Sequence, residues 1–111
     1  MYRNKSIQVI AISLFCLPLA AREPAKHKIA VVGLVHSHVW GHLTTMLEGK
    51  SATLVGVSEP NAELVAEAKK AGVPENLFFG DYRKMLDEAK PDIVWAFVEN
   101  NRHLEIAKEC A

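Results

Sequence analysis

The stretch that most constrains the fold is Lys28–His42, which reads KIAVVGLVHSHVWGH. Four apolar residues from Ile29 lead into Gly33, and a polar turn that carries histidines then leads into Val39. This order predicts a buried strand, a tight glycine turn and the first turn of a helix. A helix that starts directly after such a turn presents backbone N–H groups and the positive end of its dipole, which together favour an anion.

The glycine turn matches only part of the pattern that dinucleotide-binding turns share. That pattern, G-x-G-x-x-G, places glycine at the first, third and sixth positions, and the six residues from Gly33 read GLVHSH. Val35 carries a branched side chain where the backbone normally approaches a phosphate, and His38 replaces the small residue that packs helix against strand. Because Gly33 also suits an ordinary strand-to-helix turn, the stretch alone leaves both interpretations open.

The N-terminal segment has the features of a secretory signal peptide. Residues 1–21 contain Arg3 and Lys5, followed by an apolar run over residues 7–20 that ends in small side chains. The run is short for a helix that crosses a bilayer. We therefore expect export to the periplasm or the medium, with an uncleaved membrane anchor as the alternative.

Residues 22–27 then form a polar linker, and residues 28–111 the expected folded domain. The whole chain has 13 basic and 13 acidic residues, and loss of the signal peptide removes two basic residues and no acidic one, which leaves a net charge of −2. Nucleic-acid binding calls for a basic stripe, whereas charges of both signs are interspersed here, so no nucleic-acid partner is expected. Cys110 becomes the only cysteine, which excludes an internal disulfide.

Beyond the linker, apolar strand-like runs alternate with amphipathic helical segments four times, with short loops between them. Alternation of this kind predicts an α/β fold with a doubly wound parallel sheet covered by helices. The expected strands are Ile29–Leu34, Thr53–Ser58, Leu77–Phe79 and Ile93–Val98, and the expected helices begin near Ser37, Pro60, Asp81 and Asn101.

Local signals place the ends of these elements. Ser37 and Asp81 are expected to cap the first and third helices, and Gly49 to end the first. The unbroken apolar run of the fourth strand predicts a place at the sheet centre, with Trp95 in the core. The last predicted helix continues to Ala111 and no strand follows it. We therefore expect a partial sheet that belongs to a fragment of a longer protein.

Four segments of the domain resemble the N-terminal domain of the Gfo/Idh/MocA family, the glucose-fructose oxidoreductase and inositol dehydrogenase type. They are KIAVVGLVHSH at the first strand, LVGVSEPN at the second, GDYRKMLDEAKPDIVWAF leading into the fourth, and ENNRHLEIAKECA after it. In that family an acidic residue and a proline follow the second strand, as Glu59 and Pro60 do here. A Thr-Pro-Asn-x-x-His turn follows the fourth strand, and of that turn Asn100 and His103 match whereas the Thr-Pro pair does not.

The resemblance implies a nicotinamide-dependent oxidoreductase that acts on sugars or cyclitols, built from a Rossmann domain and a larger substrate domain. The family's Glu-Lys-Pro signature, whose lysine is the usual catalytic contact, is absent from this chain, so no residue is assigned to catalysis. We therefore expect an NAD(P)-binding domain, with a sugar-like substrate bound only in a full-length form. The alternative is an exported binding or interaction module that kept the fold and lost the cofactor.

The residues expected to contact the dinucleotide share one position, just after the carboxyl ends of strands. They are Gly33, His36, Ser37 and His38 after the first strand, Glu59 after the second, and Asn100 and His103 after the fourth. A carboxylate at Glu59 can accept hydrogen bonds from the adenosine ribose and repels a 2′-phosphate, which favours NAD over NADP. The competing interpretation of Glu59 is a solvated acid in a Ser-Glu-Pro-Asn turn.

The histidines and tryptophans invite other interpretations. His38 and His42 are four residues apart on one helix face, but the segment 33–47 holds no cysteine or carboxylate that would complete a metal site, so none is expected. Trp40 either packs against the core or shapes the cleft, and the sequence does not decide between the two.

Overall fold

The computed structural model describes residues 25–111, which include the whole expected domain. The predicted signal peptide, residues 1–21, lies outside the described residues. Within the part of the chain that the structure describes, no helix is both long enough and apolar enough to cross a membrane.

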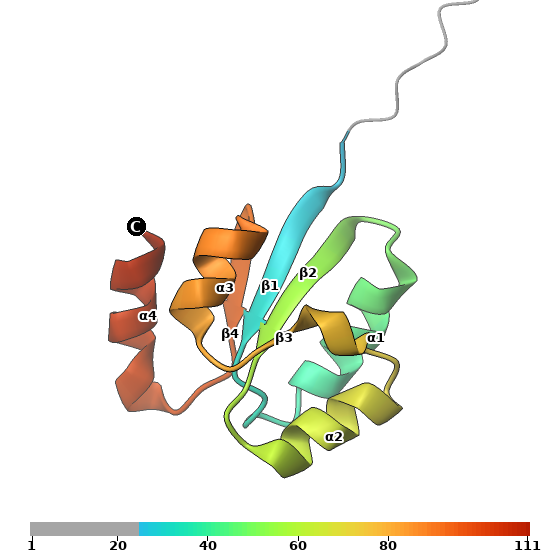
Figure 1. Ribbon diagram of the computed structural model, residues 1–111, viewed down its shortest axis with the longest axis horizontal. Helices are drawn as coiled ribbons and strands as arrows, with labels where there is room; N and C mark the ends of the chain where they lie inside the picture. Colours follow the sequence, from blue (N-terminus) through green and yellow to red (C-terminus); the bar gives the residue numbers. More distant parts are fainter. Residues whose placement is uncertain (1–24) are drawn as a thin grey trace, which may run out of the picture.

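A four-stranded parallel sheet forms the centre of the domain (Figure 1). Its strands are β1 (His27–Val32), β2 (Ala52–Ser58), β3 (Phe78–Phe79) and β4 (Ile93–Ala96), in the spatial order β3-β2-β1-β4. Because β1 pairs with both β2 and β4, the chain leaves β3 at one edge and returns on the other side of β1. This reversal of strand order marks the place where open α/β sheets bind ligands. The predicted fold class is therefore confirmed.

Helices cover both faces of the sheet (Figure 1). α1 (Val39–Glu48) and α2 (Ala62–Lys70) pack on one face, and α3 (Tyr82–Ala89) and α4 (His103–Cys110) pack on the other. Two short 3-10 turns, η1 (Glu75–Leu77) and η2 (Asn100–Arg102), precede β3 and α4.

Alternation along β1 builds a separate apolar core on each face. Ile29 and Val31 pack with α1 and α2, whereas Ala30 and Val32 pack with α3 and α4, and all four side chains are buried. Successive side chains of a strand point to opposite faces, so a strand covered on both sides must be apolar throughout. β1 is therefore the strand around which both layers are arranged.

Most predicted helix ends are confirmed, with one exception. Asn61 and Asp81 cap α2 and α3, each accepting a hydrogen bond from the backbone N–H two residues further on, and α1 ends at Gly49 in the left-handed region. The prediction that Ser37 caps α1 is wrong, because His38 occupies the N-cap position without a side-chain cap bond. The turn has already entered a helical conformation at His38, with φ of −65°, so the Ser37 side chain lies one residue too early.

The predicted central position of the fourth strand is also wrong. Among the described residues β4 pairs only with β1, so its other edge is open, and Ile93 and Trp95 are each 37% exposed. An apolar run reports that a strand is covered on its faces, but it does not report whether both edges are paired. The Trp95 side chain consequently lies at the margin of the sheet instead of in the core.

Candidate functional site

The turn after β1 is fixed by hydrogen bonds from three successive backbone N–H groups. Gly33 donates to the Ser58 carbonyl at 2.8 Å, Leu34 to Oε2 of Glu59 at 2.7 Å, and Val35 to the Phe97 carbonyl at 3.0 Å. These acceptors lie at the ends of β2 and β4, so the turn is held to both neighbours of β1. Its N–H groups up to residue 35 are therefore occupied within the protein.

Gly33 adopts a conformation that favours glycine, with φ of +83°. A Cβ placed on Gly33 would lie 2.5 Å from Cγ1 of Val98 and 2.8 Å from the Phe97 carbonyl oxygen. The expected need for glycine is thus confirmed. The crowding comes from the segment after β4.

The next three backbone N–H groups, those of His36, Ser37 and His38, donate to no acceptor within residues 25–111. They precede α1, whose first turn contains no acidic side chain, and Ser37 and His38 are exposed. Free N–H groups at the start of a helix form a natural anion site, because the helix dipole adds to their partial positive charge. The turn therefore fits a phosphate group, contacted at residues 36–38 and not at the glycine itself.

Glu59 is buried and holds this turn in place through two hydrogen bonds. Its side chain is only 6% exposed; Oε2 accepts the Leu34 N–H, and Oε1 accepts the Asn61 N–H at 3.0 Å. The interpretation of Glu59 as a solvated turn acid is therefore wrong. A carboxylate has about four acceptor positions, so two remain after these bonds.

The histidines of the turn differ in their surroundings. Nε2 of His36 lies 2.8 Å from the Val98 carbonyl oxygen, which makes that ring nitrogen the donor and adds a further tie to the segment after β4. The rings of His36 and His38 are nearly parallel, with centroids 6.4 Å apart. His38 is exposed beside the free N–H groups.

Asn100 and His103 lie after β4, as predicted. Asn100 begins η2 and His103 begins α4, and both are exposed. No hydrogen bond or ion pair among the described residues joins either one to the turn after β1. His103 instead lines two hollows along β4.

A cavity of about 230 Å³ lies beside the turn, at the carboxyl ends of the first three strands. The residues that line it are Val32, Gly33, Ser58, Pro60, Gly80, Asp81, Tyr82, Arg83 and Arg102. Neither Tyr82 nor Arg102 is among the site residues predicted from the sequence. The sequence did offer a signal for both residues, since Tyr82 follows the third strand and Arg102 follows the fourth. In open α/β sheets, the residues that contact a ligand lie just after the carboxyl ends of the strands.

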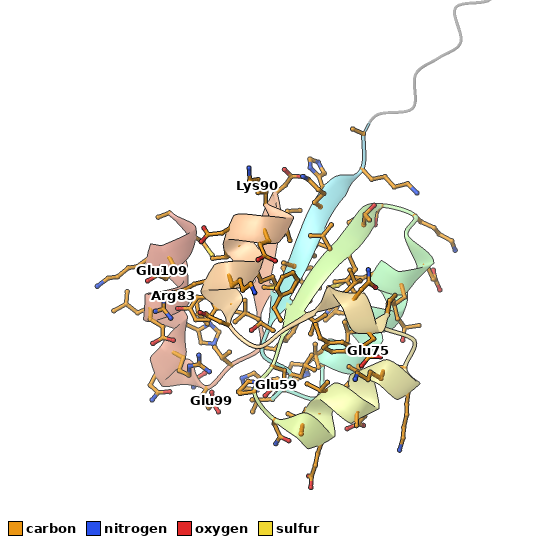
Figure 2. The ribbon with its side chains drawn as sticks, viewed as in Figure 1. Glu59, Glu75, Arg83, Lys90, Glu99 and Glu109 are labelled. Atoms are coloured by element: carbon orange, nitrogen blue, oxygen red, sulfur yellow. The ribbon has the colours of Figure 1, made fainter. Side chains whose placement is uncertain are left out.

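One ion pair joins the two helices α3 and α4 that cover the same face of the sheet. Figure 2 shows Arg83 of α3 beside Glu109 of α4, and Nε of Arg83 lies 3.2 Å from Oε1 of Glu109. The hydrogen bond to Glu109 raises the pKa of the Arg83 guanidinium, which is charged in any case. Arg102 instead forms a local ion pair with Glu105, three residues further along the chain, at 3.2 Å.

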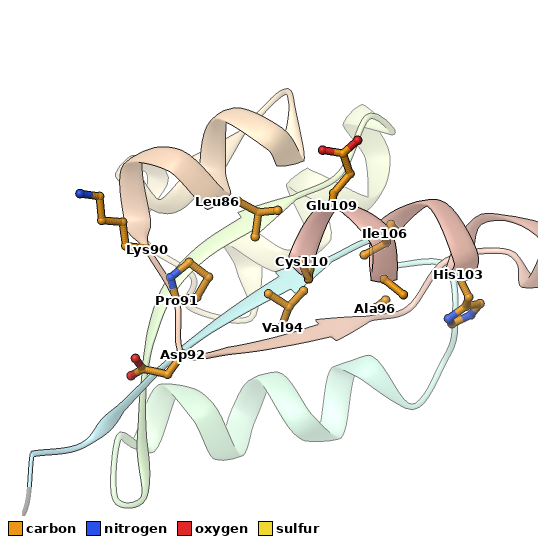
Figure 3. Close-up of a pocket in the computed structure, with 11 residues that line it drawn as sticks. Leu86, Lys90, Pro91, Asp92, Val94, Ala96, His103, Ile106, Glu109 and Cys110 are labelled. Atoms are coloured by element: carbon orange, nitrogen blue, oxygen red, sulfur yellow. The ribbon is translucent and has the colours of Figure 1, made fainter.

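A larger cavity, about 600 Å³, lies elsewhere, between α3, α4 and β4 (Figure 3). Val94 and Ala96 of β4 and Leu86 and Ile106 of the two helices line it. None of the residues of the turn after β1 contributes to it. This cavity is therefore separate from the turn after β1.

No metal centre is found in the described part of the chain. Residues 25–111 bring no three His, Cys, Asp or Glu side chains together in a metal-binding arrangement. His42 instead packs edge-on against Trp95, with ring centroids 4.7 Å apart. Trp40, left undecided by the sequence, belongs to α1 and is partly buried against the core.

Comparison with protein families agrees with this geometry. The model of the oxidoreductase family with an NAD-binding Rossmann fold, GFO_IDH_MocA, matches residues 27–111. No curated protein matches the chain. The matched residues run from the first residue of β1 to the last described residue, and so include the turn, the strand order and the cavity described above. The chain therefore belongs to the Gfo/Idh/MocA oxidoreductase family and contains its NAD-binding Rossmann domain.

Proposed function

We propose that this domain binds NAD with the pyrophosphate against the backbone N–H groups of His36, Ser37 and His38. The observation that carries the proposal is the set of three free N–H groups at the start of α1, at the sheet's switch point. Membership of an NAD-binding family supports the cofactor class. When bound, NAD supplies hydride transfer, while the residues of this chain bind and orient it.

The remaining predicted residues follow the carboxyl ends of β1, β2 and β4, where one extended ligand could contact all of them. Gly33 supplies the turn, and the two free acceptor positions of the Glu59 carboxylate are proposed to accept hydrogen bonds from the hydroxyl groups of the adenosine ribose. Asn100 and His103, at the far side of the switch point, are proposed to contact the nicotinamide half. Their exposure leaves both side chains available to a ligand.

We propose NAD in preference to NADP, because the Glu59 carboxylate would repel a 2′-phosphate. Glu59→Gln removes the charge at nearly constant size, and Glu63→Gln on the exposed surface of α2 is the matched control. Calorimetric titration of both variants with NAD and NADP tests this choice. The ratio of the two affinities should move toward NADP for Glu59→Gln alone, and an unchanged ratio would remove Glu59 from cofactor selection.

The substrate is proposed to be a sugar or cyclitol, on the strength of the family membership alone. None of the described residues has an assigned role in proton transfer, so we propose that this domain acts with a substrate domain that carries the catalytic lysine. The chain as printed is then a fragment competent for cofactor binding. NAD reduction by the chain with added sugars or cyclitols would contradict this proposal.

A second candidate is a binding module that kept the fold and lost the cofactor. Two observations favour it: the first three N–H groups of the turn are occupied internally, and Val35 places a 47% exposed branched side chain at the turn. Absence of any NAD, NADP or ADP-ribose binding in calorimetry would select this candidate over the first.

For location, we propose that residues 1–21 direct export to the periplasm or medium. The charged start and short apolar run support it. Expression of the chain in a bacterial host, followed by N-terminal sequencing of periplasmic protein, tests it. Recovery of the intact N-terminus in the membrane fraction would select the anchor instead.

A further inference from the structure

β4 forms one edge of the sheet, and its outer side pairs with no strand in the described part of the chain. Within residues 25–111 it bonds only to β1, so the backbone N–H and C=O groups that point away from β1 have no strand partner. An edge of this kind can bond to a further strand. The opposite edge, β3, is only two residues long and offers much less backbone for pairing.

Cavities adjoin β4 on both faces of the sheet. On the face covered by α3 and α4, Val94 and Ala96 line the cavity of about 600 Å³ (Figure 3). On the face covered by α1, Ile93 and Trp95 line a cavity of about 250 Å³. Successive side chains of a strand point to opposite faces, so a strand added at this edge would direct its side chains alternately toward the two cavities.

A third cavity follows the open edge itself. It has a volume of about 450 Å³ and is lined by residues 94–97 together with His42 of α1 and His103 of α4. Because its lining joins helices from opposite faces, this cavity extends along the side of β4 where a further strand would lie. The apolar side chains of β4 border it, so the strand that fits there is apolar at successive positions.

The sequence of β4 meets this requirement. The strand reads IVWA, apolar at every position, and continues with Phe97 and Val98. A second copy of the chain presents the same strand at its own open edge. Two copies related by a twofold axis would join these edges and cover each other's exposed Ile93 and Trp95.

The charges at the two ends of β4 favour antiparallel pairing. Lys90 precedes the strand, without an ion pair within residues 25–111, and Glu99 follows it; both are exposed. Antiparallel pairing centred on Val94 or Trp95 brings Lys90 beside residues 98–100 of the second copy. Opposite charges then meet at both ends of the interface, whereas parallel pairing would set each charge beside its like.

We propose that this chain forms a symmetric dimer through antiparallel pairing of two β4 strands, with Lys90 of each copy beside Glu99 of the other. The two four-stranded sheets then become one continuous sheet. Each copy uses its β4 edge once, so the assembly closes at two chains. The inference does not rest on the proposed cofactor function.

The test exchanges the two charges, with dimerisation measured by sedimentation velocity over a range of concentrations. Lys90→Glu and Glu99→Lys each place like charges together at both ends of the interface. Each should weaken dimerisation about 5- to 30-fold, as expected for two exposed ion pairs turned repulsive. The double variant restores opposite charges and should dimerise nearly as tightly as the parent. Lys70→Glu, an exposed position on α2, adds the same charge change as the control and should have no effect.

Recovery of the dimer in the double variant is the result that supports antiparallel pairing of β4. Weakening in the double variant equal to the two single losses combined would overturn it. A parent chain that stays monomeric at millimolar concentration would also overturn it and assign the edge to a strand of another polypeptide. Growth beyond two chains would contradict the closed, twofold arrangement.

Discussion

At the scale of single residues, the site depends on contacts between positions that are distant in sequence. Glu59 reaches Leu34 across 25 positions, and His36 reaches Val98 across 62. Both contacts hold the turn that presents the free N–H groups of residues 36–38. The turn is therefore rigid because two neighbouring strand ends hold it, and not because of its glycine content.

Glu59→Gln should lower the free energy of unfolding by about 1–3 kcal/mol. The amide replaces one acceptor oxygen with a donor that faces a backbone N–H group, and the site is buried. Urea denaturation measures the change, with Glu63→Gln as the exposed control. Equal stability of the two variants would show that the hydrogen bonds of Glu59 to Leu34 and Asn61 contribute nothing to the free energy of unfolding.

The buried Tyr82 side chain should make the free energy of unfolding decrease as the pH rises above about 10. Burial raises the pKa of Tyr82 above its usual value near 10. Above pH ~10 the unfolded chain loses this proton while the folded chain retains it, so the folded state binds more protons and stability falls as pH rises. Urea midpoints between pH 8 and 11 should fall less steeply for Tyr82→Phe than for the parent; parallel curves would contradict this.

At the scale of elements, periodicity and capping residues predicted most of the fold. The strand-helix alternation, the end of α1 at Gly49 and the Asp81 cap of α3 follow from local patterns that a sequence displays directly. The open edge of β4 and the position of Trp95 do not, because edge pairing depends on which strands lie beside one another. The hydrogen bond from Leu34 to Glu59 and the Tyr82 hydroxyl, which has no partner among the described residues, were not predicted for the same reason. The groups that surround these two side chains belong to other helices and strands.

Asp81→Ala should destabilise the domain by about 1 kcal/mol through loss of the α3 cap. The Asp81 side chain accepts the Arg83 N–H at 2.9 Å, and capping bonds of this kind contribute about that much. Asp87→Ala, an exposed position on the same helix, is the control. The comparison is made by urea denaturation, and a loss of equal size at Asp87 would assign the effect to charge and not to capping.

At the scale of the whole molecule, the open edge of β4 is the feature most exposed to other chains. Ile93 and Trp95 present apolar surface there, and β4 contains no lysine, proline or other residue that discourages edge pairing. We therefore expect the chain to self-associate as its concentration rises.

Trp95→Lys should reduce that self-association, because a charge on an edge strand opposes pairing with another strand. Leu104→Lys adds the same charge at a 66% exposed position on α4, away from the strand edge, and should have a smaller effect. Sedimentation velocity over a range of concentrations measures both. Equal effects would show that general solubility, and not the β4 edge, controls association.

The central claim is that the free N–H groups of residues 36–38 bind the pyrophosphate of NAD. Gly33→Val is a poor test, since its side chain would collide with Val98 and disturb the fold. Ser37→Asp is a better one, because an exposed carboxylate beside the start of α1 stabilises the helix by about 0.3–1 kcal/mol yet repels a phosphate. Ser51→Asp, an exposed position beyond the other end of α1, adds the same charge as the control.

Calorimetric titration of the three proteins with NAD is therefore the most direct measurement. Two like charges ~4 Å apart repel by about 4 kcal/mol at the effective dielectric of a protein surface. NAD affinity should consequently fall at least about tenfold for Ser37→Asp, without loss of thermal stability, and stay near the parent value for Ser51→Asp. NAD binding that is unchanged in Ser37→Asp would contradict the account.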